Sequence, residues 1–293
     1  MREEIDDRDG LFPIRELSAR TQVNTVTLRA WERRYGLLTP ARSAKGHRLY
    51  CDDDVSTIEK ILALVARGVS IGKVKPLLVS DEPVAVADAA DSWEDAIDEL
   101  VDAVKLFSVT KVEHIIQQSF ASYPAPICRE RLIEPVFARL SQAGDHAAVG
   151  FIESELIRYT LVRLSAKLGK KKSRHQVTLI VGNQTPIWCL ALMALELVDV
   201  NFSVHLFARN FSVETGLKLA KQFESTITVF YQDGIWKEKD RQLAAAAQLE
   251  NDQLLLCGTA PKLANLDQLE RVFAELKSCI GSLIVSGAEG GRE

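Results

Sequence analysis

Hydroxyl and guanidinium side chains recur at helical spacing within residues 24–35. Thr25, Arg29 and Arg33 are four residues apart, so a helix here places them on one face, with Thr27 and Arg34 on its flank. Hydroxyls and guanidinium forks suit the phosphate edge and the base acceptors of a DNA major groove. The spacing predicts a DNA-binding helix face. The alternative is a charged face that is only solvated.

The same helix has an apolar face that gives it a core to pack against. Leu28, Trp31 and Tyr35 recur on that face, and we expect them to contact Leu17 and Val23 of the preceding segment. Glu32 lies between Trp31 and Arg33. Its carboxylate either holds a guanidinium in position or is only solvated.

Residues 40–50 form a second basic segment. A glycine-containing turn at residues 43–46 separates two short extended stretches, which predicts a β-hairpin, or wing. By strand alternation Arg48 and Tyr50 share a face while Leu49 points to the core. We interpret His47 as a donor to backbone or phosphate, because no second His or Cys lies at metal-ligand spacing. The basic side chains of this segment are Arg42, Lys45, His47 and Arg48.

Charge is distributed unevenly along the chain. The formal net charge is −4, yet residues 11–80 hold 12 Lys and Arg against 6 Asp and Glu, which leaves 24 against 34 for the rest. The first segment is therefore +6 and the remainder −10. This asymmetry indicates a polyanion-binding module joined to an acidic regulatory or assembly module.

The first 170 residues predict a small helical head followed by a helical bundle. Capping residues and glycines predict head helices at 14–20, 24–35, 52–67 and 70–79 within a DNA-binding domain at 11–80. Residues 81–92 mix Pro, Ala and acidic residues and are expected to be a linker. Apolar residues at helical spacing predict a bundle over 93–170.

From residue 175 the pattern changes to strands alternating with helices. Such alternation predicts a flavodoxin-like α/β domain with a parallel sheet over 175–286. Thr185 and Pro186 are expected to be the N-cap and first residue of a helix over 186–198. The β-rich runs are 177–181, 202–207, 227–231, 254–257 and 283–285.

Composition and missing motifs exclude several classes of protein. The chain is 47% hydrophobic and 26% charged, which is typical of a globular protein. Its longest uncharged apolar run, 186–195, is half of the roughly 20 residues that cross a bilayer, so we expect a cytoplasmic protein without a membrane partner. The five cysteines never take a C-x-x-C spacing. No nucleotide-binding loop or nucleophile motif occurs, so we expect no enzyme, no catalytic residue, no metal and no cofactor.

Three motifs together resemble a known family. They are Arg29-Ala-Trp-Glu-Arg-Arg-Tyr-Gly36, Gly46-His-Arg-Leu-Tyr50 and Gly68-Val-Ser-Ile-Gly-Lys-Val-Lys-Pro-Leu-Leu78. They resemble the winged helix-turn-helix of the MerR family, in its MlrA-like and CarH/LitR branch. One departure is Pro76, which is expected to kink the last head helix.

The resemblance implies a dimeric regulator that binds double-stranded promoter DNA. It also implies activation by distorting a promoter with an overlong spacer, so that RNA polymerase can use it. Regulation of extracellular-matrix and biofilm genes is a common theme of this branch. The residues that we expect to contact DNA are Thr25, Thr27, Arg29, Arg33, Arg34, Tyr35, Arg42, Lys45, His47, Arg48 and Tyr50.

The domain layout also resembles that of cobalamin-binding members of the branch. Their α/β domain has Asp-x-His-x-x-Gly after its first strand, whereas this chain has Asn183-Gln-Thr-Pro-Ile-Trp188. The bundle signature, a Glu-His pair, is replaced by Glu153-Ser154. We therefore expect no cobalamin. Two alternatives stay open for the body: a surface for dimerisation or for a regulatory protein, and a crevice in the α/β domain that binds another small molecule and controls DNA binding.

Overall fold

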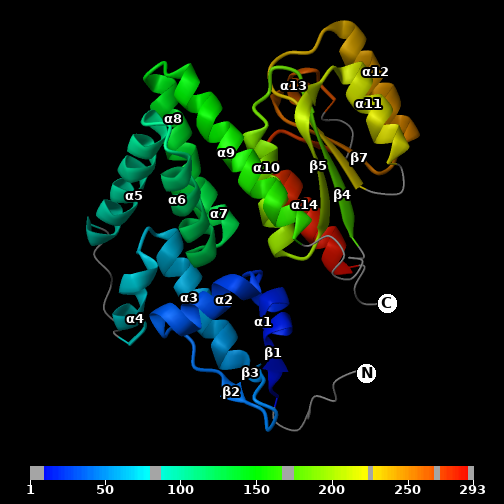
Figure 1. The fold of residues 1–293 in the computed structure, drawn as a ribbon. Helices are drawn as coiled ribbons and strands as arrows, with labels where there is room; N and C mark the ends of the chain where they lie inside the picture. The colour runs from blue at the N-terminus through cyan, green and yellow to red at the C-terminus, as the bar shows by residue number, and fades with distance from the viewer. Residues whose placement is uncertain (1–9, 80–86, 167–174, 224–226, 267–270, 290–293) are drawn as a thin grey trace. The chain divides into compact units, whose positions relative to one another are not determined.

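The computed structural model describes residues 10–79, 87–166, 175–223, 227–266 and 271–289 (Figure 1). The chain divides into two compact units, Met1–Glu155 and Leu156–Glu293. The boundary lies inside one long helix, α9 (His146–Ser165). The predicted head and the predicted bundle as far as Glu155 therefore belong to the same compact unit.

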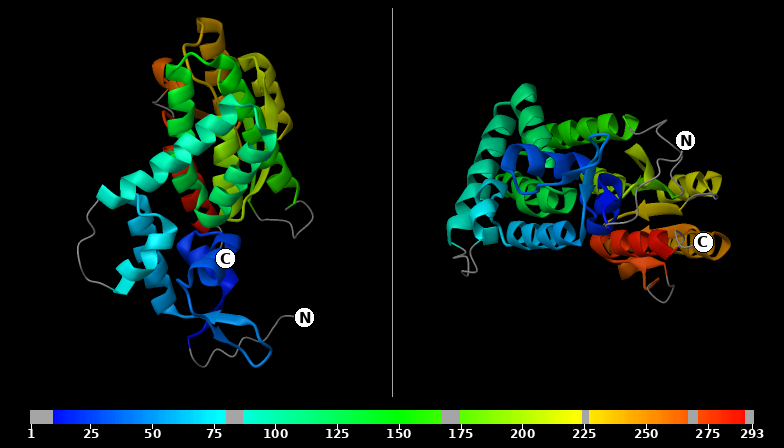
Figure 2. Two further views of the ribbon diagram at one scale, coloured as in Figure 1. Left: turned by 60° about the vertical axis from the view of Figure 1, so that its left-hand side comes forward. Right: turned by 90° about the horizontal axis from the view of Figure 1, so that it is seen from below.

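The head combines four helices with a small antiparallel sheet in the order β1-β3-β2. The predicted head helices are all present. The sequence did not predict β1, a two-residue strand in which Phe12 pairs with Tyr50. The wing projects from the head on the side away from the bundle (Figure 2). The head elements are β1 (Phe12–Pro13), α1 (Ile14–Thr21), α2 (Thr25–Tyr35), β2 (Ala41–Arg42), β3 (Arg48–Tyr50), α3 (Asp52–Ala66) and α4 (Ile71–Val79).

Local interactions define both ends of α2. The side chain of Asn24 accepts a hydrogen bond from Val26 N at 2.9 Å, which satisfies an otherwise unpaired amide of the first turn. Gly36 ends the helix in the left-handed conformation, with φ of 59°. Leu28 and Trp31 are fully buried in the head core. The sequence-predicted apolar face of this helix is thus the one that packs inward.

The bundle is helical from Ala87 to Ser165, with short turns. Its first helix begins at Ala87, so residues 87–92 are not part of a linker; 80–86 lie outside the described residues. Alanine has the highest helix propensity and acidic residues favour a first turn, which explains this start. The bundle elements are α5 (Ala87–Lys105), α6 (Val109–Ser122), α7 (Ala125–Cys128), a π-helical turn (Arg129–Ile133), α8 (Glu134–Gln142) and α9.

The second unit is built on a parallel sheet of five strands in the order β5-β4-β6-β7-β8. This is the flavodoxin-like order, which confirms the predicted α/β class. Helices α10 and α14 cover one face of the sheet, and α11 and α12 cover the other (Figure 1). Its elements are β4 (Gln176–Gly182), α10 (Trp188–Asp199), β5 (Ser203–Phe211), α11 (Val213–Gln222), β6 (Ile227–Tyr231), α12 (Glu238–Glu250), β7 (Leu254–Cys257), α13 (Thr259–Leu263), β8 (Val272–Phe273) and α14 (Leu276–Glu289).

The structure corrects two local predictions in this unit. Residues 283–285 form part of helix α14 rather than the fifth strand, which is β8. Cys279, Ile280 and Leu283 are buried at helical spacing. The short apolar run at 283–285 was therefore wrongly interpreted as a strand instead of part of a helix. Helix α10 begins at Trp188, not at Pro186. Thr185 does not cap this helix, because its hydroxyl oxygen accepts a hydrogen bond from Asp233 N at 3.1 Å.

Candidate DNA-binding surface

Exposed arginines line the solvent face of α2. Arg29, Arg33 and Arg34 are exposed, and Thr25 is half-buried at the start of the helix. The helix turns Leu28 and Trp31 inward, so its basic and apolar sides are separated. An exposed guanidinium row on a rigid helix can reach both phosphates and base edges.

The wing is a tight turn with exposed cations. Ser43 N donates to His47 O at 2.9 Å and Gly46 N donates to Ser43 O at 2.8 Å, which closes the turn. Gly46 takes a φ of 79°, a left-handed conformation that favours glycine. Arg42 donates to Gly46 O at 3.3 Å, so this guanidinium lies along the wing. Arg42, Lys45 and His47 are exposed.

One ion pair joins the wing to the helix. Nε of Arg48 in β3 donates to Oε2 of Glu32 in α2 at 2.6 Å. The hydrogen bond to Glu32 raises the pKa of Arg48 above its ordinary value. Of the two interpretations of Glu32, the first is confirmed, because its carboxylate binds the guanidinium of Arg48.

The structure corrects three of the predicted DNA contacts, two by their burial and one by its hydrogen bond. Thr27 is 1% exposed and Tyr50 is fully buried in the head core, so neither side chain can reach DNA. Strand β3 turns Tyr50 inward while Leu49 is only half-buried, the reverse of the expected core assignment. Burial raises the pKa of Tyr50 to about 12. The hydroxyl of Tyr35 donates to Ser122 Oγ at 3.3 Å and thus faces the bundle.

The remaining eight residues stay predicted contacts. The structure places them on two neighbouring elements, α2 and the wing, joined by the Glu32–Arg48 pair.

Sequence reasoning missed Lys75, whose Nζ lies 3.0 Å from the position of a Cβ at Gly36, beside the carboxyl end of α2. A cation there interacts favourably with the helix dipole. The sequence signal that could have found Lys75 is its place in the third of the motifs that resemble the MerR family, residues 68–78.

Polar side chains at the carboxyl-end edge of the parallel sheet are hydrogen-bonded to one another and to the main chain. Asp233 Oδ1 accepts hydrogen bonds from the amide of Thr259 at 2.9 Å and from its hydroxyl at 3.1 Å. Oδ2 accepts one from the hydroxyl of Tyr231 at 2.5 Å. Asn210 Nδ2 donates to the carbonyls of Gly182 and Thr185, each at 2.7 Å.

These residues do not fit a corrinoid. The loop after β4 carries no imidazole that could be an axial ligand, because the chain's five histidines lie elsewhere, at positions 47, 114, 146, 175 and 205. The side chain of Gln232 also approaches Gly182 so closely that a Cβ there would lie 2.4 Å from its Oε1. Among the described residues, no group of three His, Cys, Asp or Glu side chains could hold a metal ion.

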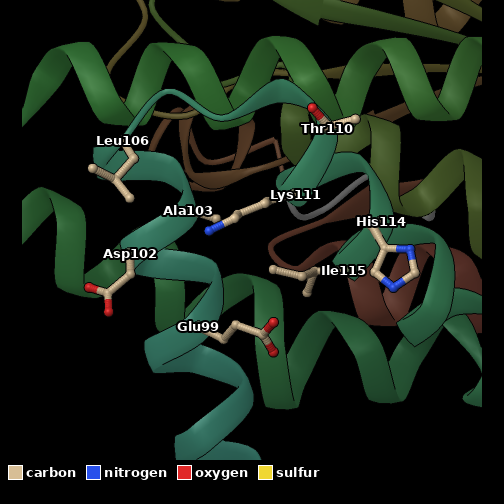
Figure 3. A pocket seen from close by; sticks show the side chains of 8 residues that line it. All are labelled: Glu99, Asp102, Ala103, Leu106, Thr110, Lys111, His114 and Ile115. Atoms are coloured by element: carbon tan, nitrogen blue, oxygen red, sulfur yellow. The ribbon is translucent and has the colours of Figure 1, made fainter.

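A separate groove lies on the bundle between α5 and α6 (Figure 3). It has a volume of about 620 Å³ and an apolar floor that includes Ala103 and Ile115. Figure 3 shows Lys111 extending from α6 toward α5 and Glu99 extending from the facing helix. Its walls therefore carry charges of both signs. The other lining residues are Asp102, Leu106, Thr110 and His114.

The fold and the basic surface define a DNA-binding transcriptional regulator with a winged helix-turn-helix head. The described helices include none long and apolar enough to span a membrane. Residues 12–80 match the family model described as "MerR HTH family regulatory protein". The chain belongs to the MerR family of transcriptional regulators and is MlrA-like within it.

The relatives agree with this assignment. The chain is 32% identical over 185 residues to the HTH-type transcriptional regulator MlrA of Escherichia coli (strain K12), covering 61% of this chain and 73% of the relative. It is 26% identical over 210 residues to the HTH-type transcriptional repressor CarH of Myxococcus xanthus, covering 66% and 69%. A Methanosarcina barkeri monomethylamine corrinoid protein aligns with a TM-score of 0.46 at 12% identity, over 66% of this chain and 99% of that one.

Proposed function

We propose that the chain acts in the cytoplasm as a homodimer that binds specific promoters through α2 and the wing and activates transcription. The supporting observation is the exposed basic face of α2, fixed to a basic wing by the Glu32–Arg48 pair. Activation proceeds by distorting the promoter so that RNA polymerase can use it. We further propose extracellular-matrix and biofilm genes as targets, on the family resemblance.

The exposed side chains divide into two roles. Arg29 and Arg33 lie on the solvent face of α2 and contact base edges in the major groove. Arg42, Lys45 and Arg48 of the wing, together with Thr25, contact phosphates and so position the head without reading sequence.

Affinity selection of fragmented genomic DNA by the full-length protein at fixed salt tests this function. The wild type is expected to enrich a few inverted-repeat promoter sites, and Arg29→Ala/Arg33→Ala is expected to lose them. Lys218→Ala/Lys221→Ala removes two exposed charges from α11 in the second unit and should leave the selection unchanged. Uniform weak retention of every fragment by the wild type would refute sequence-specific regulation by the protein alone.

The groove between α5 and α6 favours a second candidate function, regulation by a small molecule. Its volume of about 620 Å³ and its charges of both signs suit a ligand with both a cationic and an anionic group. A ligand that binds only the folded state raises the unfolding temperature. We expect a zwitterionic compound from a metabolite panel to do so with the wild type and not with Glu99→Ala/Lys111→Ala. An equal rise in both proteins would place the ligand elsewhere.

A further inference from the structure

We propose that the α6–α7 corner of the bundle, residues 122–128, is a positioning element for the recognition helix α2, so that DNA affinity depends on bundle residues far from DNA. The inference rests on the proposed DNA binding by α2. It assigns a role in DNA recognition to Ser122 and Tyr123, which lie outside the head.

Two hydrogen bonds connect α2 to Ser122. Nε1 of Trp31 donates to the main-chain oxygen of Ser122 at 2.8 Å, and the hydroxyl of Tyr35 donates to its side-chain oxygen at 3.3 Å. Trp31 and Tyr35 are one helical turn apart, on the side of α2 that also buries Leu28. Two bonds from successive turns to one residue fix both the rotation of the helix about its axis and its position along that axis.

Tyr123 connects the same corner to the rest of the head. Its hydroxyl accepts a hydrogen bond from the amide of Ile71, the first residue of α4, at 3.1 Å. Its ring lies 4.7 Å from the ring of Trp93 in α5, centroid to centroid. Tyr123 and Ile127 also pack against the head core. The corner therefore completes that core rather than merely touching its surface.

The wing is held through the same helix. Glu32 follows Trp31 in sequence and binds Arg48 of β3 at 2.6 Å. A shift of the corner is transmitted to Trp31, then through α2 to Glu32, and from Glu32 to the wing. Because packed side chains have discrete arrangements, helix and wing move together rather than independently.

A hydroxyl-deletion cycle in the full-length protein tests the proposal. Tyr35→Phe and Ser122→Ala each remove one partner of the same hydrogen bond without touching the exposed face. We expect each to weaken binding to a duplex taken from the most enriched genomic fragment by about fivefold, the equivalent of one hydrogen bond. The double variant should lose no more than either single variant, because both delete one bond. Tyr159→Phe, which removes a phenol from the second unit, is the matched control.

A second readout separates positioning from simple stabilisation. Because helix and wing move together, the number of phosphate contacts is kept while the base contacts lose their geometry. The affinity ratio of the enriched duplex to a scrambled duplex should therefore fall while the salt slope stays unchanged. Thermal melts and circular dichroism establish that each variant is folded at the assay temperature. Tyr123→Phe, which removes the acceptor of Ile71 N, provides an independent variant with the same expected direction.

The outcomes separate this inference from the proposed function. If the wild type binds the enriched duplex specifically and all three single variants keep its affinity and specificity ratio, the corner is only structural and the inference is overturned. Additive losses in the double variant would also overturn the shared-bond argument. If the wild type itself shows no specific binding, the proposed function has failed before the inference is reached.

Discussion

Arg48 donates its Nε–H to the carboxylate of Glu32 at 2.6 Å, which links the wing to helix α2. The side chains are 27% and 13% exposed, so the pair is shielded more than a typical surface ion pair. If Arg48 contacts DNA as proposed, its shielded, hydrogen-bonded guanidinium is already oriented before binding, which lowers the ordering cost.

Replacing Arg48 should weaken DNA binding in two ways. Arg48→Ala removes one of the proposed phosphate contacts, so the dependence of log affinity on log salt should flatten by about one counterion. It also leaves Glu32 as an uncompensated carboxylate near the phosphates. Glu32→Gln/Arg48→Ala should therefore bind more tightly than Arg48→Ala, as measured by fluorescence anisotropy across a salt series. An unchanged slope in Arg48→Ala would remove Arg48 from the proposed DNA contact surface.

The arginines of α2 should govern sequence specificity more than the affinity for DNA of any sequence. Arg29→Ala and Arg33→Ala should each cost about 1–3 kcal/mol in binding the enriched duplex, because each removes a proposed base contact of the bidentate kind. Binding to a scrambled duplex should change much less. The comparison is made at one fixed salt concentration, with Lys218→Ala as a control for lost charge. Equal losses on both duplexes would assign these arginines to phosphates.

Tyr50 should matter for stability in alkali and not for DNA. Its fully buried hydroxyl has no hydrogen-bond partner among the described residues, so Tyr50→Phe should stabilise the head by about 1 kcal/mol near neutral pH. Burial raises the pKa of Tyr50 to about 12, above roughly 10 in the unfolded chain. The free energy of unfolding of the wild type is therefore unaffected by this group below pH ~10 and falls as pH rises toward ~12, because the phenol ionises first in the unfolded chain. Urea unfolding at several pH values should show a steeper alkaline loss for the wild type. Weaker DNA binding by Tyr50→Phe would contradict its assignment to the core.

Substitutions at Gly281 test whether residues 276–289 form a helix, α14, rather than a strand. A Cβ there meets no heavy atom within 4 Å outside its own stretch of helix α14. Gly281→Ala should stabilise the second unit by about 1 kcal/mol, and Gly281→Val should gain less, because valine is the weaker helix former. Thermal unfolding measures both. A larger gain with valine than with alanine would favour a strand over a helix at this position.

The fold was predictable where local signals were strong. Asn24 and Gly36 define the ends of α2 in sequence as in structure, and strands β6 and β7 begin and end at the predicted residues. The prediction was wrong at 283–285, because a short apolar run does not distinguish a buried strand from one turn of a helix. The start of α5 at Ala87 was missed, since Ala and Asp occur both in linkers and in first helical turns.

The candidate site was only partly predictable. Helical spacing separated exposed Arg29 and Arg33 from buried Trp31, because an amphipathic face is a local property. The inward turn of Tyr50 depends on the pairing of β3 with β1, which involves residues far apart in sequence. The bond from Trp31 to Ser122 joins residues 91 positions apart, and no local pattern encodes it.

Hydroxyl-radical footprinting of the most enriched promoter fragment tests the central claim most directly. Wild-type protein, Lys218→Ala/Lys221→Ala and Arg29→Ala/Arg33→Ala are compared at one salt concentration. The account predicts two protected half-sites related by a two-fold axis and separated by whole turns of about 10 base pairs, with protection lost only in the α2 variant. Protection that persists in Arg29→Ala/Arg33→Ala, or that covers the fragment uniformly, would contradict sequence reading by α2.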